Sequence, residues 1–192
     1  MNFCPNCGEK VESDQNFCTN CGYSLNGNND NVKKQQLEEK DEININEPAP
    51  VGIKGGLNRD LKEPQILNYK QKMGLKTGIE NVLIGQIPNM GKMIISAAWA
   101  ALSAKYFVIS FEEQGIVLIG INAQGRFNGK NAYIPKESIS SISYRPGVLK
   151  MVLTIVANGG KNKFNCPSTI LGSPFQSQNI QNRESILQEY PA

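Results

Sequence analysis

Four cysteines near the start of the chain have the types and spacing of a metal-binding site. Cys4, Cys7, Cys18 and Cys21 follow the pattern Cys-x2-Cys-x10-Cys-x2-Cys, and a glycine comes directly after the second and the fourth cysteine. Each Cys-x-x-Cys pair can hold a metal ion from a tight turn, and the glycine suits a backbone that folds back so that its amides reach the thiolates. Four thiolates make a closed tetrahedral set, which favours Zn²⁺. The sequence therefore predicts one zinc ion with a structural role.

Two other interpretations of the cysteines stay open. Disulfide bonds need an oxidising compartment, but no basic segment followed by an apolar segment precedes Cys4, as a secretory signal peptide would require. An iron site of the rubredoxin type also uses two Cys-x-x-Cys pairs, but its pairs usually stand further apart. We therefore expect a zinc site and a cytoplasmic protein.

Residues 1–25 resemble the short N-terminal zinc ribbon of many bacterial proteins. The resemblance rests on CPNCG at 4–8 and FCTNCG at 17–22, and neither motif departs from the family pattern. It implies zinc but no particular function, because such ribbons precede many different domains. The segment holds one basic residue, Lys10, against three acidic ones, so it offers phosphate groups little attraction. We expect the ribbon to contact protein rather than nucleic acid.

No residue pattern in the chain predicts catalysis. The chain has no histidine, which removes the commonest general base and excludes a Ser-His-Asp triad. The Gly91–Lys92 pair lacks the earlier glycine and the Ser or Thr of a phosphate-binding loop. The fifth cysteine, Cys166, has no evident base beside it in the sequence, so we expect a half-buried structural side chain. We therefore expect a protein that is not an enzyme and that has no small-molecule substrate.

The composition of the chain changes after the cysteines. Residues 26–68 are rich in Asn, Lys and Glu, hold no aromatic residue and include Pro48, Pro50 and a Gly-Gly pair. Such a segment buries too little apolar surface to offset the entropy that ordering would cost. We expect a disordered linker over 26–68.

Residues 69–104 are expected to form a helical lead-in to the main domain. Apolar residues from Met73 to Leu102 recur at helical spacing, and the second half of the segment is rich in alanine. Its most apolar stretch, 93–104, is twelve residues long and is closed by a lysine on each side. A membrane span needs about 20 residues, so a buried or amphipathic helix is the better interpretation.

From residue 105 onward the apolar pattern is typical of strands. KYFVISF and GIVLIGI flank a short turn that ends at Gly115, and four further strand-like segments follow up to Pro167, separated by glycine-containing or proline-containing turns. This predicts an antiparallel meander of about six strands. The last segment, QSQNIQNRESILQEY, places Ile180 and Leu187 seven residues apart and predicts a C-terminal helix with one buried stripe.

The order of these elements is similar to that of bacterial PH-like domains. The residues that carry the resemblance are Ile139 and Ile142 before a turn, Leu153 and Ile155 on a long strand, and the Gly159–Gly160 hairpin. The resemblance covers 105–190. It implies a strongly bent antiparallel sheet or barrel of about seven strands, capped by the last helix, and a domain that binds lipids, peptides or proteins. The expected fold class is therefore a small zinc ribbon, a disordered linker and an α+β domain with a PH-like sheet.

The charge of the chain is unevenly distributed. Residues 1–69 carry 7 Lys/Arg and 11 Asp/Glu, a balance of −4, whereas residues 70–192 carry 13 and 6, a balance of +7. A basic domain favours anionic partners, although a modest excess is also ordinary solubilising charge. Two loops supply candidates for anion or partner binding, which are Arg126, Lys130, Lys161 and Lys163.

We therefore expect a non-enzymatic interaction or regulatory protein whose tethered zinc ribbon and PH-like domain engage a protein partner. Two alternatives remain. The basic domain could serve a nucleic-acid-associated regulator, whose binding would weaken steeply with salt. Residues 93–104 and the basic loops could instead associate peripherally with an anionic membrane.

Overall fold

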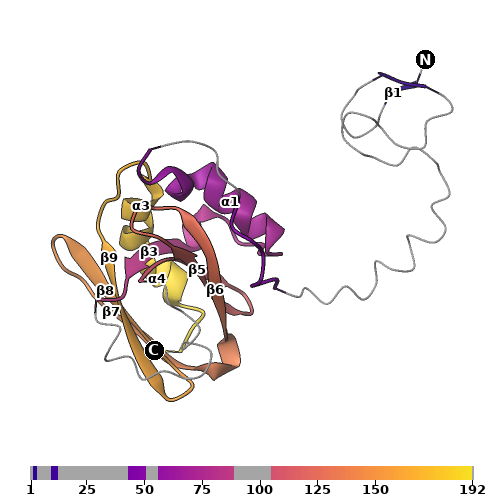
Figure 1. Ribbon diagram of the computed structural model, residues 1–192. Coiled ribbons are helices and arrows are strands. Elements are labelled where there is room, and N and C mark those ends of the chain that lie inside the picture. The colour runs from indigo at the N-terminus through magenta and orange to yellow at the C-terminus, as the bar shows by residue number, and fades with distance from the viewer. Residues whose placement is uncertain (1, 4–9, 13–42, 51–55, 89–104, 192) are drawn as a thin grey trace. The chain divides into compact units, whose positions relative to one another are not determined.

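The computed structural model describes residues 2–3, 10–12, 43–50, 56–88 and 105–191. The chain divides into two compact units, Met1–Glu42 and Ile43–Ala192 (Figure 1).

The smaller unit contains a short hairpin. Strand β1 (Asn2–Phe3) pairs antiparallel with β2 (Lys10–Val11), so that Asn2 lies opposite Val11 and Phe3 opposite Lys10.

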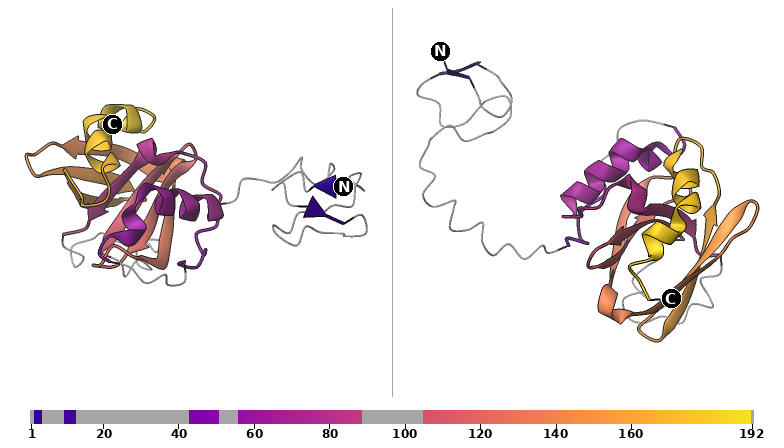
Figure 2. Two further views of the ribbon diagram at one scale, coloured as in Figure 1. Left: turned by 90° about the horizontal axis from the view of Figure 1, so that it is seen from above. Right: turned by 180° about the vertical axis from the view of Figure 1, so that it is seen from behind.

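The larger unit, which we call the sheet domain, is built on seven antiparallel strands in the order β6-β5-β4-β3-β9-β8-β7 (Figures 1 and 2). The first meander runs from β3 to β6 and the second from β7 to β9, and the two join where Gln86 pairs with Asn165. The sheet is open, with β6 and β7 at its edges. The strands are β3 (Val82–Gln86), β4 (Tyr106–Glu112), β5 (Gly115–Ile121), β6 (Phe127–Pro135), β7 (Ile139–Arg145), β8 (Lys150–Ala157) and β9 (Gly160–Pro167).

Short helices flank the sheet. They are the 3-10 turns η1 (Arg59–Leu61), η2 (Ile79–Asn81) and η4 (Lys136–Ser138) and the α-helices α1 (Glu63–Lys72), α3 (Phe175–Gln181) and α4 (Arg183–Leu187). Pro64 at the start of α1 suits a helical first turn, where its missing N–H costs no hydrogen bond.

The apolar core lies on both faces of the central strands. One cluster includes Phe107, Phe164 and Ile186, and brings α4 onto the sheet. The other includes Ile66 and Val108, and brings α1 onto the opposite face. Strands β4 and β5 are buried almost throughout, which explains why they read as continuous apolar runs rather than as alternating ones.

The predicted linker over 26–68 is wrong in its second half. Leu61 and Ile66 are buried in the second cluster. The hydroxyl of Tyr69 donates a hydrogen bond to the main-chain oxygen of Glu47 at 2.7 Å. Residues 26–42 and 51–55 lie outside the described part of the chain, so the structure does not test the linker prediction there.

The linker prediction is wrong here because it uses the average composition of the segment, which says nothing of where each apolar residue stands. The segment has few apolar side chains, but Ile43 and Ala49 also pack against the second cluster. When a few apolar side chains pack on a sheet that is already formed, the free energy of their burial offsets the entropy cost of ordering the segment. The polar segment alone could not offset that cost.

The predicted helical lead-in over 69–104 is wrong where it meets the sheet. The helix α1 ends at Lys72, and Val82–Gln86 form the strand β3, which supplies the seventh strand. A Cβ added to Gly85 would lie 3.1 Å from the Cys166 sulfur, so a glycine at this point lets β9 approach β3 closely. The predicted second helix, at 89–104, lies outside the described residues.

The predicted C-terminal helix is present as two shorter helices that meet at Asn182. Ile180 and Leu187 are partly buried against the first cluster, as the spacing predicts, but Ile186 is the more deeply buried residue. The break lets α4 turn so that Tyr190, just beyond it, also reaches the core.

Cys166 is fully buried rather than half-buried, and burial raises the pKa of its thiol from 9.0 to about 12. The unfolded chain therefore loses this proton at lower pH than the folded chain, and the thiol's contribution to stability disappears as pH rises from about 9 towards 12. Three pKa units correspond to about 4 kcal/mol.

The free energy of unfolding should fall less steeply between pH 9 and 12 in Cys166→Ala than in the wild type. Urea denaturation at a series of pH values measures both slopes. Buried tyrosines titrate in the same direction in both proteins, so only the difference in slope is diagnostic. Parallel curves for the two proteins would contradict the assignment of a buried neutral thiol.

Candidate functional site

The first Cys-x-x-Cys motif stands, in the sequence, between the two paired strands of the smaller unit. Strand β1 ends at Phe3, β2 begins at Lys10, and CPNCG at 4–8 occupies the connection. The predicted ligands Cys4, Cys7, Cys18 and Cys21 themselves lie outside the described residues.

Changing Cys18 to Ser is expected to remove the zinc and leave the sheet domain folded. A four-thiolate site draws its stability from the complete ligand set, and the sheet domain is a separate compact unit. Metal analysis should give about one zinc per chain for the wild type and none for the variant. Far-UV circular dichroism should report the same β-sheet signal in both proteins, and collapse of that signal would contradict two separate units.

The four predicted basic residues do not form one group along the sheet. Arg126 precedes β6 and Lys130 lies on it, whereas Lys161 and Lys163 lie on β9. Strands β5, β4 and β3 separate β6 from β9. The grouping of these four residues therefore has no support in the strand order.

Lys161 and Lys163 have other basic neighbours. Both are exposed on β9, and the second meander also carries the exposed residues Arg145 and Lys150. Arg145 and Lys150 are not among the residues that the sequence predicts. The available signal was the absence of any acidic residue from Ile139 through Pro167.

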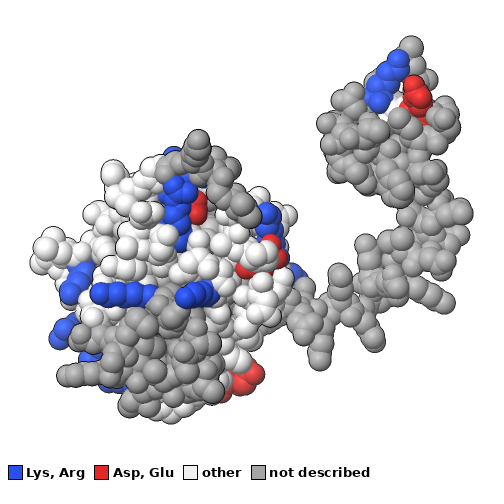
Figure 3. Space-filling model, in the orientation of Figure 1, with Lys and Arg blue, Asp and Glu red and all other residues white. Residues whose placement is uncertain are grey.

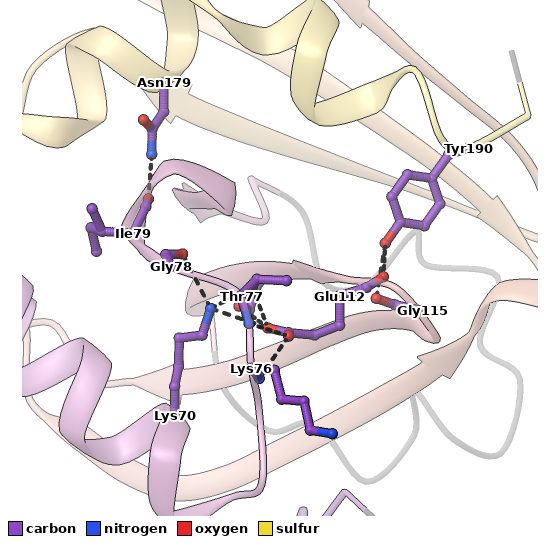
Figure 4. A network of polar contacts seen from close by, with 10 residues as sticks. Lys70, Lys76, Thr77, Gly78, Ile79, Glu112, Gly115, Asn179 and Tyr190 are labelled. Atoms are coloured by element: carbon purple, nitrogen blue, oxygen red, sulfur yellow. Dashed lines mark hydrogen bonds and ion pairs between the residues drawn. The ribbon is translucent and has the colours of Figure 1, made fainter. Parts of the chain in front are cut away.

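A buried carboxylate, Glu112, is the centre of a hydrogen-bond network at the end of β4 (Figure 4). The Glu112 side chain is 6% exposed and forms an ion pair with Lys70 Nζ at 3.1 Å. Its Oε1 also accepts from the hydroxyls of Thr77 at 2.8 Å and Ser110 at 2.6 Å. Its Oε2 accepts from the main-chain N–H groups of Lys76 at 3.3 Å and Thr77 at 3.1 Å. Five donors therefore hold this carboxylate.

Lys70 extends from α1 into the same network. It is 1% exposed, and its Nζ also donates to Thr77 Oγ1 at 2.7 Å and approaches the Gly78 main-chain oxygen at 3.4 Å. Burial lowers the pKa of Lys70, and the negative charge of Glu112 opposes this effect. The network fastens α1 and the loop after it to the end of β4.

A polar pocket of about 260 Å³ lies beside this network. Its lining combines residues of the β4–β5 turn with residues at and after α4, among them Glu113, Ser185 and Glu189. Tyr190 lies at its wall, with its hydroxyl 2.7 Å from the Glu112 main-chain oxygen and 2.9 Å from that of Gly115. Burial raises the pKa of Tyr190, and Glu112 adds to the shift. Glu112 and Tyr190 are thus engaged with other protein groups, which favours a structural role for them.

The described residues contain no group of three or more His, Cys, Asp or Glu side chains that could hold a metal ion. None of the helices described here is long and apolar enough to cross a membrane.

Comparison with known proteins identifies one part of the chain. A family model described as a zinc-ribbon domain matches residues 1–25. A search of the curated proteins found no match. The match agrees with the cysteine spacing and with the hairpin around the first motif. Residues 1–25 are therefore a zinc-ribbon domain, which indicates that the chain binds zinc.

Proposed function

We propose that this chain is a non-enzymatic interaction protein in which a structural zinc ribbon and a PH-like domain act as two binding modules. The observation that carries the proposal is the strand order of the sheet domain. A four-strand meander joins a three-strand meander through β3 and β9, and α4 packs its Ile186 into the core. A sheet of seven strands followed by a packed C-terminal helix is what the PH-like resemblance implies.

The buried polar groups support a binding role rather than catalysis. Glu112, Lys70 and Thr77 satisfy one another and the adjoining main chain. A catalytic acid or base must be able to exchange a proton with a substrate, and a carboxylate held by five internal donors is poorly suited to that task. The network instead supports a rigid scaffold that presents its surfaces.

We propose protein as the partner of the ribbon. Residues 1–25 carry an acidic excess, and four thiolates on Zn²⁺ add further negative charge, so phosphate groups would be repelled rather than attracted. A reducing, cytoplasmic compartment suits metal-bound thiolates and the single cysteine of the sheet domain. Two modules on one chain would raise the effective concentration of each at a shared target.

Affinity capture tests the proposal. The bait proteins are the full chain, the chain with Cys4, Cys7, Cys18 and Cys21 changed to Ser, and a chain that starts at Ile43. A start at Ile43 keeps the packed segments 43–50 and 56–68 with the sheet domain.

We expect the full chain to retain at least one protein that both other baits lose. That result would assign the partner to the zinc-loaded ribbon. Identical recovered proteins for all three baits would contradict a recognition role for the ribbon.

A further inference from the structure

We propose that the outer face of the second meander docks the sheet domain onto an anionic lipid bilayer. This cationic face consists of Arg145, Lys150, Lys161 and Lys163, together with the β7–β8 turn that carries Val148 and Leu149. The inference rests on the proposed function in taking the sheet domain as a binding module, and it does not depend on what the zinc ribbon binds.

The first observation is a long stretch without acidic residues. Between Glu137 and Glu184 the chain contains no Asp or Glu. The same stretch contains five basic residues, which are Arg145, Lys150, Lys161, Lys163 and Arg183. The first four are exposed. In Figure 3, basic side chains appear along the left edge of the sheet domain, where β7, β8 and β9 lie in Figure 1, and the visible acidic side chains lie elsewhere.

The strand register places these basic residues on one face. Buried and more exposed residues alternate along β8 and β9, with Leu153 and Phe164 among those that point into the core. Lys163 pairs with Thr154 and Lys161 with Val156, all four at outward positions. Directly paired residues share a face of an antiparallel sheet.

The other two basic residues belong to the same face at its open end. Arg145 pairs with Val152 on β8, and Lys150 pairs with Pro167 on β9. Neither Arg145 nor Lys150 is buried, and both flank the β7–β8 turn. The cationic face therefore extends from the β8–β9 hairpin to the β7–β8 turn.

The turn itself presents two aliphatic side chains to solvent. Val148 is 95% exposed and Leu149 is 82% exposed. Ser168 secures the turn, because its N–H donates to the Leu149 oxygen at 2.9 Å and its hydroxyl donates to the Val148 oxygen at 3.3 Å. The two apolar side chains thus stand at the tip of an anchored hairpin, between two cations.

This combination matches the interface of an anionic bilayer better than it matches nucleic acid. Lys and Arg are attracted to anionic headgroups, and short apolar side chains beside them can enter the boundary between headgroups and acyl chains. Surfaces that bind single-stranded nucleic acid usually add aromatic side chains on which bases stack. The outward positions of β7, β8 and β9 named above include no aromatic residue. The exposed Val148 and Leu149 side chains would gain nothing from contact with a phosphate backbone.

Vesicle co-sedimentation of the full-length, zinc-loaded chain tests the proposal. The vesicles are phosphatidylcholine alone and phosphatidylcholine mixed with phosphatidylserine. We expect binding to the mixed vesicles, weakening with salt, and little binding to phosphatidylcholine alone. Changing Arg145, Lys150, Lys161 and Lys163 to Gln should lower the affinity by about tenfold or more.

A matched variant controls for net charge. Changing Lys62, Lys72, Lys76 and Lys130 to Gln removes the same charge from the N-cap and the end of α1, the loop after it and β6. This control should keep most of the binding. The paired change Val148→Ser and Leu149→Ser should lower binding at a salt concentration that screens the charges, and all changed residues are exposed, so folding should be unaffected.

Several outcomes would overturn the proposal. They are an absence of binding to mixed vesicles, equal losses in the two four-Gln variants, and binding to DNA or RNA oligonucleotides without binding to vesicles. The last outcome would assign the face to nucleic acid. The four-Ser variant of the zinc ligands should bind vesicles like the wild type, so this test and the capture experiment can fail independently.

Discussion

Replacing Glu112 by Gln is expected to destabilise the sheet domain by about 3–5 kcal/mol, the range for breaking a buried ion pair. Both oxygens of the Glu112 carboxylate accept hydrogen bonds in a site where the side chain is 6% exposed. The amide nitrogen of Gln cannot accept, so at the Oε2 position it would face the main-chain N–H groups of Lys76 and Thr77, and at the Oε1 position the Lys70 ammonium. It also leaves the Lys70 ammonium buried without its counter-charge. Urea denaturation followed by circular dichroism measures the loss.

Two variants show whether the carboxylate is the centre of the network. Lys70→Met also breaks the buried ion pair, but four donors still hold the carboxylate, so we expect a loss near the lower end of the same range, about 3 kcal/mol. Glu113→Gln, one residue on, changes an exposed carboxylate and should have little effect. A loss below about 1 kcal/mol for Glu112→Gln would contradict the buried network.

A chain that starts at Asn68 is expected to lack a stable sheet domain, whereas a chain that starts at Ile43 should fold. The shorter chain loses Leu61, Ile66 and the first half of α1, which cover one face of the sheet. Truncating one buried Ile or Leu to Ala costs about 2–5 kcal/mol, and the total stability of a domain is about 5–15 kcal/mol.

Comparing the two chains by circular dichroism and urea denaturation checks this prediction. Ile66→Ala in the longer chain supplies an intermediate, with an expected loss of about 2–5 kcal/mol. Equal stability of the two chains would contradict the covering role of segments 43–50 and 56–67.

The parts of the fold that follow local rules could be predicted from the sequence. The cysteine spacing identifies the ribbon, and the family match agrees with it. Strands β4 and β5 carry long runs rich in β-branched residues on either side of a short glycine-containing turn. Their pairing as a hairpin can therefore be predicted from the local sequence alone.

The parts that depend on distant partners could not be predicted. The segment around Leu61 looks like a linker because its few apolar residues gain a packing surface only once β4, β5 and β6 are paired. The run Val82–Gln86 fits a helix or a strand on pattern alone, and its pairing with Ser110–Tyr106 decides for the strand.

The same limit applies to the candidate binding residues. Residue type and nearness to turns place Arg126, Lys130, Lys161 and Lys163 in one candidate set. The strand register places Arg145 and Lys150 on the face of Lys161 and Lys163, and a register cannot be read from residue types.

The two units of the chain are proposed to bind different partners. The zinc ribbon, which we propose contacts protein, belongs to the first unit, and the cationic face, which we propose contacts an anionic bilayer, belongs to the second. A chain of this kind would bring a protein partner to a membrane surface, or would bind it only where both are present.

Site-specific photo-crosslinking from the ribbon tests whether the zinc-loaded ribbon contacts a protein. Lys10 is exposed on β2, so a photoactivatable residue in its place would report what the ribbon touches in cells. We expect a discrete protein adduct that disappears when Cys4, Cys7, Cys18 and Cys21 are changed to Ser. The absence of any protein adduct, or the same adduct in the four-Ser variant, would contradict a zinc-dependent interaction protein.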